Sequence, residues 1–179
     1  DQAAKKSVRS VIDGDALRRV GVISLPAFYQ DFGARQKNDP QFKSATRDVA
    51  RLLEELKQEK VDGVLIDLRN NGGGSLSEAI DLTGLFVGKG PVLQQRDAQG
   101  MLTVEKTANS KVAWDGPLEV LINRGSASAS EIFAAAIQDY GRGLVIGEQS
   151  FGKGTVQTMI DLDRVAKNEK PQLGELKMT

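Results

Sequence analysis

The sequence contains neither cysteine nor histidine among its 179 residues. Without cysteine, a thiol nucleophile, a disulfide framework and a thiolate metal site are all excluded. Without histidine, a Ser-His-Asp triad cannot be built from this chain alone, and any general base encoded here must be Lys, Asp, Glu or Tyr. We predict no bound metal ion and no cofactor.

A net charge and a long apolar run are also missing. Lys+Arg and Asp+Glu both number 24, so the formal net charge is +0, which gives no support to nucleic-acid or anionic-membrane binding. No apolar run approaches the ~20 residues of a membrane span. Because the chain starts at Asp1 rather than Met, we expect it to be a piece of a longer protein, and the lack of a signal peptide does not identify a compartment.

Strand and helix patterns alternate in the first half of the chain. Arg19–Pro26 alternates and is rich in β-branched residues, and Val61–Leu68 is nearly continuously apolar at its centre, so both are predicted strands. Gln41–Lys60 repeats apolar residues at helical spacing and is predicted as an amphipathic helix. Ala27–Pro40 is predicted as a loop. The loop carries three aromatic residues, Phe28, Tyr29 and Phe32. We expect them to pack against the core; the alternative is that they form a wall of a substrate site.

The second half continues the alternation. Ser75–Val87 is predicted as a helix capped by Ser75 or Ser77, Gly90–Val104 as two short strands around a turn, and Trp114 as a packing anchor. The remaining predictions are a strand over Pro117–Asn123, a helix over Ala127–Tyr140, strands over Leu144–Gly147 and Thr155–Leu162, a polar loop over Asp163–Pro171, and a strand from Gly174 to Thr179. This order indicates an α/β domain.

Arg69–Ser75 (RNNGGGS) forms a glycine-rich turn between a predicted strand and a predicted helix. The exposed N–H groups of such a helix start suit a phosphate or a developing oxyanion. A tight turn that needs positive φ at glycine explains the same residues equally well, so both interpretations stay open here. The spacing is not that of a dinucleotide-binding fingerprint.

A serine cluster marks the next change from strand to helix: Ser126, Ser128 and Ser130. A serine oxygen at this junction can attack a carbonyl while the amide of Ala129 donates to the oxyanion, as in a nucleophile elbow. The competing interpretation is that Ser126 or Ser128 only caps the helix, with Glu131 completing a capping box to Ser128. These residues alone favour capping.

Lys153 follows in the run GEQSFGKG, which nearly fits a phosphate-binding loop. The fit fails because Gly154 stands where a magnesium-binding hydroxyl is needed, and because the next residues alternate like a strand. A lysine accepts a proton from serine only when neutral, which requires its pKa to fall by ~2–3 units. The apolar residues Phe151 and Val156 are consistent with a buried amine, and Gln157 would share a strand face with Lys153.

The motifs DLRNNGGG, NRGSASASE and GKGTVQ, in this order, resemble those of the tail-specific, or C-terminal processing, proteases. The resemblance covers about Arg19 to Thr179. It implies a serine endopeptidase with a Ser–Lys dyad and a crotonase-like core (ClpP/crotonase type) of stacked β-strands and helices. By motif position it implies that Ser128 is the nucleophile, that Lys153 is the general base and that Gln157 supports the lysine. The oxyanion donors would be the amides of Ala129 and Gly73.

Asp139 matches an acid that is sometimes assigned to a charge relay in this family. If Ser128 and Asp139 share one helix, the eleven-residue separation at ~1.5 Å per residue corresponds to roughly 16 Å. We therefore predict a structural role for Asp139 near the helix end, together with Arg142, rather than direct participation.

The resemblance also implies partners, location and domain organisation. Substrates would be proteins or peptides with apolar C-terminal tails, an adaptor protein and peripheral membrane association are possible, and the location would be periplasmic. We expect residues 1–18 to be a linker or edge strand from an absent upstream domain, and residues 19–179 to be a protease core that is incomplete at its C-terminus. The PDZ module usual in the family is not expected within this chain.

Two other functions remain as alternatives. One is a non-catalytic ligand-binding module of the same fold, against which the intact serine and lysine motifs argue. The other is a crotonase-type acyl-CoA enzyme, which shares the glycine oxyanion site but has no need of a serine–lysine pair.

Overall fold

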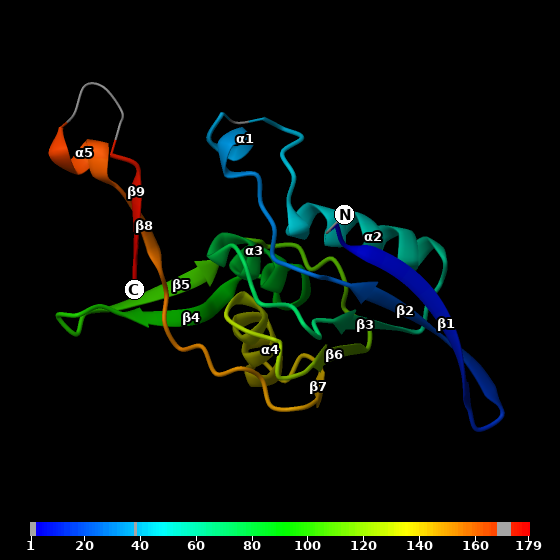
Figure 1. Cartoon of the computed structure of the whole chain (residues 1–179). Helices are drawn as coiled ribbons and strands as arrows, with labels where there is room; N and C mark the ends of the chain where they lie inside the picture. The colour runs from blue at the N-terminus through cyan, green and yellow to red at the C-terminus, as the bar shows by residue number, and fades with distance from the viewer. Residues whose placement is uncertain (1–2, 38, 168–172) are drawn as a thin grey trace.

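The computed structural model describes residues 3–37, 39–167 and 173–179. Its centre is a five-stranded sheet in the order β1-β2-β3-β6-β7, in which β1 is antiparallel to β2 and the other neighbours run parallel (Figure 1). The strands span Lys5–Asp13 (β1), Ala16–Ser24 (β2), Gly63–Asp67 (β3), Leu118–Ile122 (β6) and Leu144–Gly147 (β7). The α/β class predicted from the alternation of patterns is confirmed.

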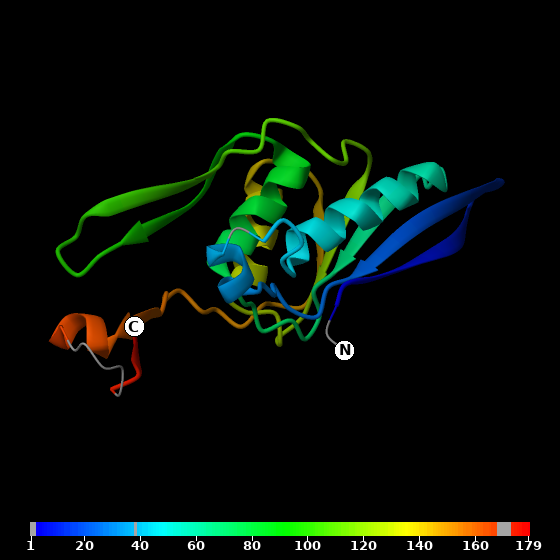
Figure 2. The same cartoon turned by 90° about the horizontal axis from the view of Figure 1, so that it is seen from above.

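Three helices cover one face of this sheet (Figures 1 and 2). They are α2 (Ala45–Gln58), α3 (Leu76–Val87) and α4 (Ala129–Asp139). Ile23, Ile66 and Val120 are paired across neighbouring strands and fully buried beneath the helices. Leu65 points to the opposite face and stays partly exposed. The alternation of burial along each strand therefore fixes which face holds the core.

Serine residues start two of these helices. The hydroxyl of Ser44 accepts from the Arg47 N–H (3.3 Å) and the hydroxyl of Ser75 accepts from the Glu78 N–H (3.3 Å). Ser75 is thus the cap of α3, one of the two alternatives predicted. The residues of α2 that face the core recur at helical spacing: Ala45, Val49, Leu52, Leu53 and Leu56.

Two antiparallel ribbons extend from the helical side, at the end opposite the β1–β2 hairpin (Figures 1 and 2). The first, β4 (Gly90–Arg96) with β5 (Leu102–Thr107), confirms the predicted pair of strands. The second joins β8 (Thr158–Asp161) to β9 (Glu175–Met178) and contains the short helix α5 (Leu162–Ala166).

Several predicted boundaries were wrong. The predicted loop Ala27–Pro40 contains the short helix α1 (Phe32–Gln36), because Asp31 accepts from the Ala34 N–H (2.9 Å) and starts a turn. Asp161 similarly starts α5 inside the predicted polar loop Asp163–Pro171, whose residues 168–171 lie outside the described part. The strand predicted from Thr155 begins only at Thr158.

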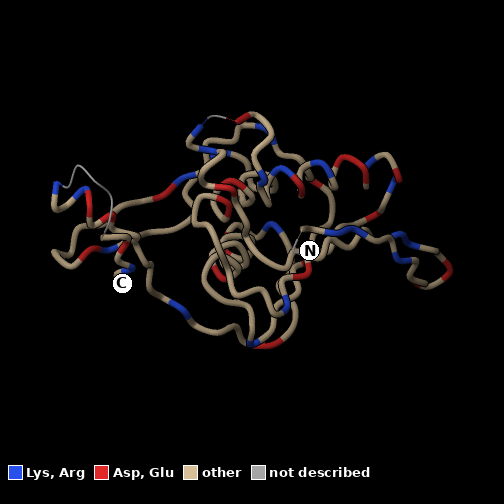
Figure 3. The backbone as a smooth tube through the Cα atoms, turned by 45° about the horizontal axis from the view of Figure 1, so that its top comes forward, with Lys and Arg blue, Asp and Glu red and all other residues tan. Residues whose placement is uncertain are grey.

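Residues 1–18 hold β1 and the start of β2, and β1 is an edge strand of the main sheet. Lys6 of this hairpin forms ion pairs with Glu55 of α2 (3.0 Å) and with Glu59, the residue that follows the helix. Charges of both signs are otherwise mixed along the chain (Figure 3). The division of the chain into an entering segment and a catalytic core stays a prediction.

None of the helices in the described ranges has the length and apolar character needed to cross a membrane. Those same ranges hold no group of three or more acidic side chains arranged to bind a metal ion.

Candidate active site

The ends of β3 and β6 bring two loops together. Because these strands are parallel neighbours, the glycine-rich turn after β3 meets the serine-rich turn after β6 at one edge of the sheet. The Ala127 N–H donates to the Asn71 carbonyl (3.0 Å), and the Ser126 hydroxyl donates to the Leu68 carbonyl (2.8 Å). Two motifs that lie more than fifty residues apart in the sequence are therefore hydrogen-bonded neighbours.

The three serines of the cluster have different surroundings. Ser126 and Ser130 are fully buried, and the Ser130 hydroxyl donates to the Asn71 carbonyl (2.9 Å), just as Ser126 is bound to Leu68. Ser128 is partly exposed and lines an open cleft. Two serines thus join the loops, while the middle one faces the space where a substrate could lie.

Ser128 has an unusual backbone conformation, with φ 59° and ψ −115°. An ordinary N-cap residue lies in the β region, and positive φ in a residue with a Cβ costs roughly 1–3 kcal/mol. Strained serines of this kind occur at nucleophile elbows, where a sharp turn from strand to helix exposes the hydroxyl. The geometry agrees with the elbow interpretation, although the side chain of Glu131 also returns to the Ser128 N–H as in a capping box (2.7 Å).

The cleft beside Ser128 has a volume of about 890 Å³. Its wall includes three residues predicted for the site in addition to Ser128: Ala129, Lys153 and Gln157. Apolar side chains from four elements also line it: Phe32, Leu76, Ile80, Leu93 and Ile132. Of the three aromatics expected to pack, Phe28 is buried, Tyr29 is half-buried and Phe32 instead faces the cleft.

The glycine turn lies directly against the serine turn. A Cβ built on Gly73 would be 2.8 Å from the Cβ of Ser128 and 3.0 Å from the Ala129 nitrogen, so only glycine fits there. The Gly73 N–H, however, donates to Oδ1 of Asn71 (2.9 Å), a buried residue that does not line the cleft. Gly72 and Gly74 line the cleft, whereas Gly73 does not.

Glu131 joins the serine turn to the lysine loop, a role that the sequence did not reveal. Its carboxylate accepts from the N–H groups of Ser128 (2.7 Å), Gly152 (2.6 Å) and Lys153 (3.0 Å), and from the Ser150 hydroxyl (2.8 Å). Burial alone would raise the pKa of Glu131, but these hydrogen bonds outweigh it and lower the pKa below its ordinary value. The capping-box spacing was the only local signal for this residue.

The surroundings of Lys153 differ from those predicted. Residues 151–157 form no strand, so Gln157 is not placed on a shared strand face, and its amide donates to Thr179 Oγ1 (3.1 Å). Phe151 is 70% exposed and Val156 45% exposed, so they do not bury the amine. Within the described residues no hydrogen bond joins the Lys153 amine to Ser128 or Gln157. Local alternation could not reveal that the chain leaves the sheet here.

Asp139 lies outside the cleft. It is exposed near the end of α4 and lines a separate hollow of about 370 Å³ with residues of β4. No ion pair joins Asp139 to Arg142 within the described residues, and the structural role predicted for Asp139 stays a prediction. The Arg142 guanidinium instead donates to three backbone carbonyls, those of Phe86, Trp114 and Gly116. Trp114 is buried and donates to the Pro117 carbonyl (3.0 Å), as expected of a packing anchor.

Comparison with known proteins gives relatives that are described as peptidases or proteases. The family model described as Peptidase family S41 matches residues 19–174. The chain is 42% identical over all 179 residues to a tail-specific protease of Haemophilus influenzae, and 42% identical over 137 residues, 72% of this chain, to a carboxyl-terminal-processing protease of Synechocystis. It covers 23% and 32% of those two relatives, so it spans about a quarter to a third of their length.

Solved structures resemble the fold. A photosystem II D1 C-terminal processing protease matches with a TM-score of 0.71 and 30% identity, over 88% of this chain and 39% of that one. Mature CPAF in complex with lactacystin matches with a TM-score of 0.67 over 97% of this chain and 45% of that one. At 16% identity, the second match shows a shared fold alone.

Proposed function

Because the chain belongs to peptidase family S41, we propose that it carries the catalytic core of a serine endopeptidase in which Ser128 is the nucleophile. The observation that carries the proposal is the contrast among three serines: Ser126 and Ser130 are bound to carbonyls, and Ser128 alone is held in a strained turn beside the cleft. A serine oxygen so presented attacks a peptide carbonyl and forms an acyl-enzyme.

Lys153 is the proposed general base. Its neutral amine takes the proton of the Ser128 hydroxyl as the oxygen bonds to the carbonyl carbon. The resulting ammonium then gives that proton to the departing amine. Both residues line one cleft, which supports this pairing. Since Phe151 and Val156 are exposed, we expect bound substrate to exclude the water that would otherwise favour the charged amine. Gln157 is proposed to orient the amine, which requires it to leave Thr179.

The oxyanion would be held by the Ala129 N–H at the start of α4 together with a glycine amide. Gly73 lies closest to Ser128 but donates to Asn71, so its use requires that bond to be exchanged for one to the oxyanion. Gly72 and Gly74 face the cleft and are the competing donors. The crotonase-like architecture, in which such amides polarise a carbonyl, is part of this proposal.

For the whole protein, we propose that the substrates are proteins recognised by apolar C-terminal tails, with an adaptor protein and a periplasmic location. The names of the relatives, tail-specific and carboxyl-terminal-processing protease, support C-terminal selection. The apolar residues of the cleft wall, such as Ile80 and Ile132, suit aliphatic side chains near the scissile bond.

The test is covalent labelling of the full-length protein by a serine-reactive phosphonate, read by mass spectrometry, together with peptidase activity. We expect Ser128→Ala to abolish both and Lys153→Ala to reduce both by at least ~10²-fold. Ser126→Ala is the matched control and should still be labelled. Retained activity in Ser128→Ala would refute the assignment. An unlabelled wild-type protein would favour the binding module, and acyl-CoA turnover without labelling would favour the crotonase-type enzyme.

A further inference from the structure

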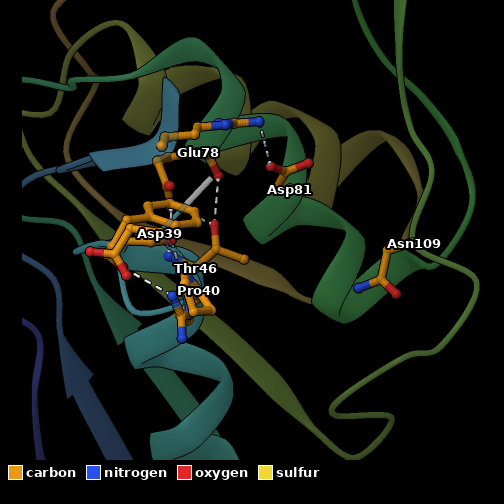
Figure 4. Close-up of a pocket in the computed structure, with 10 residues that line it drawn as sticks. Asp39, Pro40, Thr46, Glu78, Asp81 and Asn109 are labelled. Carbon is orange, nitrogen blue, oxygen red and sulfur yellow. Dashed lines mark hydrogen bonds and ion pairs between the residues drawn. The ribbon is translucent and has the colours of Figure 1, made fainter. Parts of the chain in front are cut away.

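A buried carboxylate lies behind the glycine turn. Glu78, in the first turn of α3, is 1% exposed and borders a second hollow rather than the cleft of Ser128 (Figure 4). One carboxylate oxygen accepts from Gln30 Nε2 (2.7 Å). The other accepts from Ser44 Oγ (2.9 Å) and from the N–H and hydroxyl of Thr46 (both 2.7 Å). Every one of these donors is neutral, and no lysine or arginine of the described ranges pairs with Glu78.

Glu78 determines how the amide of Gln30 is turned. Because Gln30 Nε2 donates to Glu78, its Oε1 faces α3 and accepts from the hydroxyls of Ser77 (3.2 Å) and Ser75 (3.4 Å). An amide has distinct donor and acceptor ends, so an acceptor at Nε2 fixes which end meets the serines. The carboxylate and the amide together attach the segment around Gln30 to the start of α3.

The same segment forms the back of the glycine turn. The Phe28 N–H donates to the Gly73 carbonyl (2.9 Å), and the Ser75 N–H donates to the Phe28 carbonyl (2.8 Å). A Cβ on Gly74 would overlap the Phe28 carbonyl oxygen. On its other side this turn touches Ser128, as the contacts of Gly73 show. A displacement of residues 28–30 therefore moves the glycine turn that packs against Ser128.

We propose that Glu78 and Gln30 are positioning residues for hydrolysis at Ser128. They hold residues 28–30 against the glycine turn and so fix the backbone amides that stabilise the oxyanion. Neither side chain lines the cleft, so the inference concerns the chemical step rather than substrate binding. It rests on the proposed peptidase function.

The expected effect follows from the sensitivity of catalysis to geometry. Misplacement by about 1 Å costs roughly 10²-fold in rate, and loss of one oxyanion donor costs about 10²–10³-fold. Glu78→Gln replaces one acceptor oxygen by an NH₂ group, so either Gln30 or the Ser44–Thr46 pair loses its acceptor. Gln30→Met keeps the length of the side chain and removes both of its hydrogen-bonding ends.

The experiment uses the full-length protein and a peptide substrate. It measures kcat, KM, the rate of phosphonate labelling of Ser128 and the thermal melting curve. We expect Glu78→Gln and Gln30→Met to lower kcat and the labelling rate by about ten- to a hundredfold, with KM within about twofold of wild type. Asp81→Asn is the matched control: Asp81 lies on the same helix and lines the same hollow, is exposed, and forms a long ion pair with Arg35 (4.0 Å).

Unchanged kcat in folded Glu78→Gln and folded Gln30→Met would overturn the inference, as would a loss of kcat that only follows the unfolded fraction. If Glu78→Gln does not fold, the kcat of Gln30→Met decides whether the inference holds, because Gln30 is only half-buried and its replacement is less disruptive. If lowering the temperature refolds a variant and thereby restores its kcat, the loss of kcat came from unfolding, which would also contradict a positioning role. The proposed function fails separately, since that failure appears as a wild-type protein that is neither active nor labelled.

Discussion

The backbone N–H groups of Ser128 and Lys153 donate to the same atom, Oε2 of Glu131, over 2.7 and 3.0 Å. The two residues proposed as nucleophile and base are therefore held at a fixed backbone separation by one carboxylate oxygen. The other oxygen accepts from Ser150 and Gly152 and holds the loop that leads to the lysine. One side chain of α4 thus assembles the site from two distant segments.

Glu131→Gln should weaken this connection. Replacement of one oxygen by NH₂ leaves either the Ser128–Lys153 pair or the Ser150–Gly152 pair without an acceptor, at about 1–3 kcal/mol for each unsatisfied group. We expect labelling of Ser128 to slow by at least about tenfold. Glu148→Gln, an exposed glutamate of the same loop, is the control. Equal labelling rates in the two variants would contradict the role of Glu131.

The low pKa of Glu131 predicts a dependence of stability on pH. A carboxyl whose folded pKa lies below its ordinary value of 4.5 stabilises the fold above that pH, and the contribution is lost as pH falls through the folded pKa. Urea unfolding of wild type and Glu131→Gln should therefore differ most above pH 4.5, with the difference narrowing below it. A difference independent of pH from 3 to 6 would contradict this assignment.

The positive φ of Ser128 predicts that glycine relieves strain there. Ser128→Gly should be more stable than Ser128→Ala by roughly 1 kcal/mol or more, since only glycine adopts this conformation freely. Both variants lack the hydroxyl, so their difference in unfolding free energy isolates the backbone. The control is Ala135→Gly at an exposed position within α4, which should instead cost about 1 kcal/mol. Equal stability of the two Ser128 variants would mean that the turn is unstrained.

The glycine turn predicts that alanine substitutions at two adjacent positions, Gly72 and Gly73, affect the labelling of Ser128 very differently. Gly73→Ala places a Cβ within 2.8 Å of Ser128 and combines that overlap with a φ of 100°, so we expect labelling of Ser128 to be lost. Gly72→Ala has nothing within 4 Å of its Cβ and should leave the labelling rate within about threefold of wild type. Comparable labelling rates in both variants would remove the steric argument.

The sequence predicted features that depend on neighbouring residues and missed those that depend on distant ones. The helical spacing of α2, the cap at Ser75 and the distance of Asp139 from Ser128 are local properties. The bonds of Glu131 to residues 19 to 22 positions away, and of Gln30 to Glu78 across 48 positions, have no local pattern. Gln157 was assigned to a strand because TVQTMIDL alternates, yet β8 starts one residue after it and, in the part of the chain that the structure describes, pairs with β9 in a separate two-stranded sheet.

Phe28 belongs to two parts of the molecule at once. Its backbone forms the back of the glycine turn, and its buried ring contacts Phe133 of α4, with ring centres 6.4 Å apart. A substitution that shrinks this ring would let the turn and the helix of the nucleophile shift relative to each other. Mutations of this buried ring are therefore expected to affect activity as well as stability, and a screen for activity should identify Phe28 although it is buried and does not line the cleft.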